Sequence, residues 1–67
     1  MLVESEAIRA IEYDARRRKL RVTFTSGGRY EYEAVSGDLH RAFLAADSKG
    51  RFFHDHVLDR YPYRRLR

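Results

Sequence analysis

Two clusters of basic residues carry the clearest chemistry in this sequence. They are Arg16-Arg17-Arg18-Lys19 and, towards the C-terminal end, Arg60, Arg64, Arg65 and Arg67, which lie beside Tyr61 and Tyr63. The chain has 14 Lys and Arg residues, of which twelve are arginine, against 10 Asp and Glu, and its net charge is +4. Arginine binds phosphate bidentately and stacks on bases, so this bias favours a nucleic-acid partner.

The same clusters also have a simpler interpretation as a solvated turn and a frayed tail. A net charge of +4 is ordinary for a small soluble domain. If the two clusters share a surface, they form a positive patch flanked by Tyr61 and Tyr63, and phosphate binding there should weaken with salt. The sequence leaves that arrangement open.

Tyr30 and Tyr32 are candidates for base stacking, because aromatic side chains on a sheet often bind single-stranded RNA. The strand register expected below places both on the face that carries Val22 and Phe24, beneath the helices. We therefore predict that both tyrosines pack in the core, with their hydroxyl groups reaching its rim.

Metal and catalytic sites are not expected. His54 and His56 lie two positions apart, about 200° around a helix, so they cannot chelate one ion, and His40 adds at best a poor site. Ser5, Ser48 and the histidines show no nucleophile-base spacing, and no phosphate-binding glycine loop is present. We predict a protein that is not an enzyme and that uses no cofactor and no metal.

Three strands are predicted, over residues 7–14, 19–25 and 29–35. Ile8 lies three residues before Ile11, so a bulge is expected near Arg9. Ser26-Gly27-Gly28 should close a hairpin in which Thr25 faces Arg29. That register pairs Phe24 with Tyr30, Val22 with Tyr32, Leu20 with Ala34, Arg21 with Glu33 and Thr23 with Glu31.

Two helices should follow these strands. Ser36 is the expected N-cap of the first, with Asp38 in its first turn. Its apolar stripe is Leu39, Ala42, Phe43 and Ala46, and Gly50 is expected to end it. A second helix over about residues 51–60 should bury Phe53, Val57 and Tyr61, with Phe52 beside them and with Pro62 preventing its continuation.

The expected architecture is an α+β fold, a three-stranded antiparallel β-meander followed by two short α-helices packed on one face. With 67 residues and no cysteine, we expect one domain over residues 1–67, with a small core that depends on packing. The first and third strands would both be sheet edges, and an exposed edge could pair with a second copy of this chain or with another protein. No apolar run approaches the ~20 residues that cross a bilayer, and no secretory signal is recognised. We therefore expect a cytoplasmic protein that has no membrane as a partner.

With these elements placed, the sequence resembles the KTSC domain, a small module found at the C-terminus of some lysyl-tRNA synthetases and also as a stand-alone protein. The segments that carry the resemblance are Ser5, Ile8, Ile11-Glu12-Tyr13-Asp14, Leu20-Arg21-Val22-Thr23-Phe24, Tyr30-Glu31-Tyr32, Val35, Ser48-Lys49-Gly50-Arg51-Phe52-Phe53 and Tyr61-Pro62-Tyr63. The sequence departs from the family pattern at Ser36-Gly37 and at His54. The resemblance implies RNA binding only through the attachment to a tRNA synthetase.

The leading hypothesis is a small non-enzymatic module that binds RNA. The arginines of the turn and the tail would bind phosphates, with Tyr61, Tyr63 or Phe52 as stacking groups. The alternative is a protein-interaction module that uses an exposed sheet edge or an apolar patch near Phe52.

Overall fold

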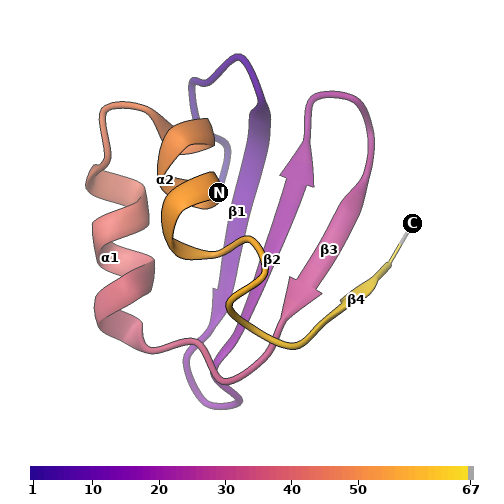
Figure 1. The fold of residues 1–67 in the computed structure, drawn as a ribbon, viewed down its shortest axis with the longest axis vertical. Helices are drawn as coiled ribbons and strands as arrows, with labels where there is room; N and C mark the ends of the chain where they lie inside the picture. The colour runs from indigo at the N-terminus through magenta and orange to yellow at the C-terminus, as the bar shows by residue number, and fades with distance from the viewer. Residues whose placement is uncertain (67) are drawn as a thin grey trace.

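The computed structural model describes residues 1–66 as an α+β fold, in which two helices cover one face of an antiparallel sheet (Figure 1). The sheet has four strands in the order β1-β2-β3-β4. In chain order the elements are β1 (Ile8–Asp14), β2 (Lys19–Phe24), β3 (Arg29–Tyr32), α1 (Gly37–Ala45), α2 (Lys49–His56) and β4 (Tyr63–Arg65). The predicted fold class is therefore right, and the predicted number of strands is wrong by one.

The predicted bulge in β1 is confirmed. The register of β1 against β2 shifts between Ile8 and Ala10, so that Ile8 faces Phe24 while Ile11 faces Val22. Both isoleucines are fully buried. The extra residue of the bulge places the side chains of Ile8 and Ile11, which are three positions apart, on the same face of the sheet.

The predicted register of β2 against β3 is wrong by two residues. Leu20 pairs with Tyr32 and Val22 with Tyr30. The loop is closed one position earlier than expected, because the Gly27 N–H donates to the Phe24 carbonyl at 2.9 Å. Gly27 takes the positive φ of 105° that ends such a loop. A shift of two keeps the pleat in phase, so each side chain is still on its predicted face.

The helix boundaries follow two serine caps. The Leu39 N–H donates to Ser36 Oγ, as predicted, and the Arg51 N–H donates to Ser48 Oγ, which starts α2 earlier than expected. Gly50 therefore lies inside α2, and its predicted role as a helix stop is wrong. A Cβ at Gly50 would lie 3.3 Å from the Ala7 Cβ, so this glycine permits close approach between α2 and the chain before β1.

The last segment of the chain forms a strand that the sequence analysis missed. Helix α2 ends at His56, and a turn with Asp59 at a φ of 62° precedes β4. β4 pairs with β3, so β3 is not a sheet edge as predicted. The outer side of β1 is partly covered as well, by a bridge between Leu2 and Ala10.

The core lies between the helices and the sheet. Its buried apolar residues are Ile8, Ile11, Leu20, Val22, Tyr32, Val35, Phe43, Phe53 and Val57. β3 and β4 lie at the end of the sheet away from α1 (Figure 1). Among residues 1–66, neither helix has the length and apolar character needed to cross a membrane.

Candidate nucleic-acid interface

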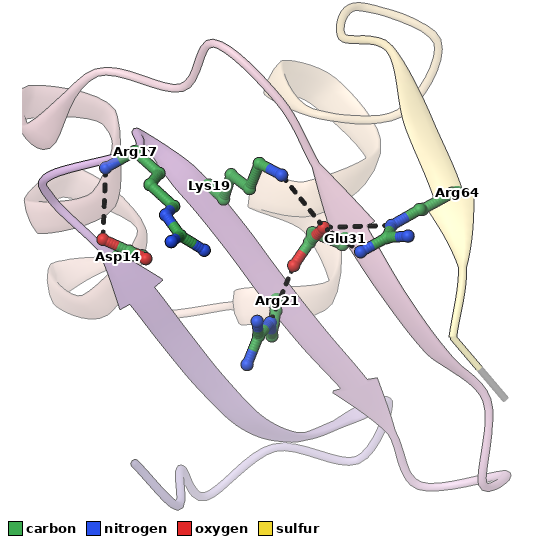
Figure 2. Close-up of polar contacts among 6 residues, drawn as sticks. All are labelled: Asp14, Arg17, Lys19, Arg21, Glu31 and Arg64. Atoms are coloured by element: carbon green, nitrogen blue, oxygen red, sulfur yellow. Dashed lines mark hydrogen bonds and ion pairs between the residues drawn. The ribbon is translucent and has the colours of Figure 1, made fainter.

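The face of the sheet opposite the helices, here called the open face, carries a row of alternating charges, of which Figure 2 shows the part from Arg21 to Arg64. Glu12 pairs with Arg21, Arg21 with Glu31, and Glu31 with Arg64, across all four strands. The row exists because the actual register sets Arg21 opposite Glu31 instead of Glu33. Opposite charges that face each other across strands stabilise the pairing.

Glu31 is the centre of this row, and its side chain is 1% exposed. Its carboxylate accepts hydrogen bonds from Arg21 Nε at 2.8 Å and Arg64 Nε at 3.1 Å, and Lys19 Nζ lies 3.7 Å away. The Arg21 hydrogen bond is the largest cause of a lowered Glu31 pKa, with Arg64 and Lys19 adding to it. Since charged side chains cover Glu31, it is a buried, ion-paired anion that lies on the open face, outside the apolar core.

The turn between β1 and β2 places part of the first basic cluster on the same face. The Arg16 and Arg17 N–H groups donate to Asp14 Oδ1 at 3.1 Å, which fixes the turn. The Arg17 side chain extends over the face that also carries Lys19 (Figure 2). Arg16, Arg17 and Arg18 are all exposed.

The second basic cluster is divided between the two faces of the sheet. Arg64 lies on the open face, where it binds Glu31. Arg65 lies on the helix side, with its guanidinium carbon 5.7 Å from the centre of the Tyr30 ring. Arg60 is exposed in the turn after α2, and Arg67 lies outside the described residues. Among residues 1–66, the members of the two clusters that lie together on the open face are Arg17, Lys19 and Arg64.

An aromatic pocket lies on the helix side of β3 and β4, with a volume of about 390 Å³. Tyr32 and Phe53 are its buried residues, with ring centres 5.5 Å apart. Tyr63 packs against Tyr30 at 5.8 Å and against Tyr32 at 5.6 Å, and remains 56% exposed. Leu58, Asp59 and Arg65 also line the pocket.

The Tyr32 hydroxyl is a neutral group in this pocket. Burial is the main cause that raises the Tyr32 pKa to about 12, and Tyr30, Tyr63 and Asp59 add to the effect. The phenol therefore stays protonated at neutral pH and can both donate and accept a hydrogen bond.

The predicted core position of the central tyrosines is confirmed for Tyr32, while Tyr30 is only half-buried. Of the predicted stacking groups, Tyr63 lines the pocket, and Tyr61 is half-buried against the core. Phe52 stacks on Phe43 with ring centres 5.2 Å apart, so it belongs to the packing between the helices.

The sequence pattern did not indicate the ion pairs around Glu31, the place of Asp59 or the pocket itself. The one local signal for β4 was Pro62 directly before Tyr63, because proline is tolerated at the start of an edge strand. His54 contacts only its neighbour Asp55 among the described ionisable groups, at 3.3 Å. Residues 1–66 hold no group of three side chains arranged for a metal ion.

Comparison with known proteins assigns the family. The sequence model of the KTSC domain matches residues 4–61. An uncharacterised protein of Stutzerimonas stutzeri is 43% identical over 51 residues, covering 76% of this chain and 72% of that protein. A Tsukamurella paurometabola protein is 41% identical over 59 residues, covering 88% of each chain.

A solved structure extends the match to the whole fold. The crystal structure of a KTSC domain protein from Yersinia pestis superposes with a TM-score of 0.97 at 34% identity, covering 100% of this chain and 94% of that one. The superposition thus includes β4, beyond the last residue of the family match. The chain belongs to the KTSC domain family.

Proposed function

We propose that this protein is a non-enzymatic RNA-binding module whose open face binds the phosphates of a single strand. The observation that carries the proposal is the cluster of Lys19, Arg21 and Arg64 around Glu31. Three cations against one carboxylate leave this group with a net charge of +2, and beside it the charges of Arg17 and Asp14 offset each other (Figure 2). Basic side chains that follow one face are the electrostatic footprint of nucleic-acid binding.

The geometry of the ion pairs supports phosphate binding. Arg21 is 51% exposed and Arg64 is 63% exposed, although each binds Glu31. Guanidinium groups have five N–H donors, so donors remain for a second oxyanion. Glu31 holds the two arginines in place, which lowers the entropy lost when a phosphate binds.

Protein interaction through an edge strand has weaker support. β3 is paired with β4, and β4 has three residues, two of them arginines, directly after a proline. Short edge strands with charged residues and proline disfavour the addition of another strand.

The test is a fluorescence titration of a labelled single-stranded RNA and a duplex of the same sequence at about 50 and 200 mM salt. The double variant Lys19→Gln/Arg64→Gln should reduce the slope of log K against log salt by about 1.4, because each lost phosphate contact removes ~0.7 for a single strand. Arg41→Gln/Arg51→Gln is the matched control, since it removes two exposed arginines from the helices.

Circular dichroism of both variants verifies that they are folded. The proposal fails if the wild-type protein shows no salt-sensitive binding at about 10–100 μM, well within the range of non-specific binding. It also fails if the open-face variant and the helix variant change the slope equally.

A further inference from the structure

The aromatic pocket beside β4 has no role in the phosphate contacts of the open face. We infer that it binds one unpaired base of the RNA strand, an inference that rests on the proposed function. Its volume of about 390 Å³ falls in the lower part of the ~300–1,000 Å³ range of small-ligand sites. A flat ring stacked on tyrosine is the ligand that this lining favours.

The tyrosines supply the stacking surface. Tyr63 keeps 56% of its surface exposed while one part of its ring packs on Tyr30 and Tyr32. A buried support of this kind holds the ring in one orientation, so little entropy is lost when a ligand stacks on it. Base stacking on such a ring tolerates any base, because every base has a π face.

The polar groups of the pocket match the edge of a base and not an alkyl chain. Tyr32, whose hydroxyl stays neutral, and Asp59 both line the pocket. Asp59 accepts hydrogen bonds and Tyr32 both donates and accepts, which suits the amino and carbonyl groups of a base edge. An apolar occupant would leave these groups desolvated and unpaired, at a cost in affinity.

The alternation of β4 connects the pocket to the open face. Successive residues of a strand point to opposite faces, so Arg64 binds Glu31 on one side while Arg65 lies over Tyr30 on the other. A sugar-phosphate chain that crosses this edge therefore meets a cation on each side. The base must be unpaired to enter, so the pocket selects single strands or splayed loops over a duplex.

The test compares two RNA probes of equal length. One contains 2-aminopurine among ordinary bases, and the other is an abasic ribose-phosphate chain. Tyr63→Ala should weaken binding of the first probe by about 5- to 150-fold, which corresponds to ~1–3 kcal/mol for one stacked base. Tyr63→Phe should retain the affinity, and Leu2→Ala, an exposed apolar residue beside β1, is the control.

Three further results are expected. The abasic chain should bind the wild type and Tyr63→Ala equally, the salt slope should be the same for both proteins, and 2-aminopurine fluorescence should be quenched only with a tyrosine or phenylalanine at position 63. Equal affinity of wild type and Tyr63→Ala for the base-containing probe would overturn the inference and leave the open-face proposal standing. If neither probe shows salt-sensitive binding, the inference and the open-face proposal are both overturned.

The pocket can also be tested without a strand. Adenosine monophosphate should shift the NMR signals of Tyr30, Tyr63 and Leu58. Shifts with N-acetyl-tyrosinamide and none with the nucleotide would assign the pocket to a protein side chain and overturn the inference.

Discussion

The replacement Glu31→Gln tests the charge row of the open face. It keeps the shape of the side chain and removes the charge that three cations share. The partners are partly exposed, Lys19 at 31%, Arg21 at 51% and Arg64 at 63%, so water already weakens each pair. Exposed pairs contribute ~0.2–1 kcal/mol each, and the glutamine carbonyl can replace one bond. We therefore expect a loss of about 1–2 kcal/mol at neutral pH.

For a domain of this length, each kcal/mol changes the Tm by ~4–8 °C, so the Tm should fall by about 4–16 °C. The pH dependence has a definite sign. The folded-state pKa of Glu31 is lowered, so its stabilisation is present above the unfolded pKa and is lost as pH falls through the folded pKa. The difference between wild type and variant should be constant above about pH 5 and should shrink below about pH 4.

Urea unfolding at several pH values measures this difference, and Glu33→Gln is the control because Glu33 is an exposed carboxylate of the same segment. The reasoning is refuted if Glu31→Gln is as stable as wild type at neutral pH. It is also refuted if the deficit persists unchanged in acid. The variant raises the charge of the open face by one, and the glutamine carbonyl still accepts a hydrogen bond from one of the two arginines. The gain in charge should therefore exceed the loss of preorganisation, so that RNA affinity rises while stability falls, which separates the two effects.

Two further predictions concern the helix side of β3 and the strand that protects its edge. In an absorbance titration of the phenols, one tyrosine should ionise with a pKa of about 12, and Tyr32→Phe should remove that step. Since burial raises this pKa, the free energy of unfolding should decline from about pH 10 upwards. Ionisation of Tyr32 at the ordinary pKa of tyrosine would contradict the burial. Deletion of residues 63–67 exposes the edge of β3, so light scattering should show association and the Tm should fall, whereas a monomer of unchanged Tm would show that β4 is dispensable.

Local patterns were sufficient for most of the fold. The bulge near Arg9 followed from the odd spacing of Ile8 and Ile11, and the cap at Ser36 followed from residue type and position. The faces of Tyr30 and Tyr32 were also right, because the pleat has a period of two and survives a register error of two. These features depend on neighbours in the chain.

The pairing of distant segments was not predictable in the same way. Glycine is the residue type that commonly ends a helix, so Gly50 was interpreted as a helix stop. The contact that explains this glycine is with Ala7, 43 positions away in sequence, and no local pattern indicates it. The register error hid the contact between Arg21 and Glu31, since either of two carboxylates on one face satisfies the pattern.

The sequence by itself determined the family, the alternating faces of the strands and the abundance of arginine. Only the tertiary structure decided where those arginines act. β4 has three residues, too few for a periodic signal, and it is a strand because β3 offers it an edge. That one pairing buries Glu31 under Arg64 and places Tyr63 in the lining of the aromatic pocket.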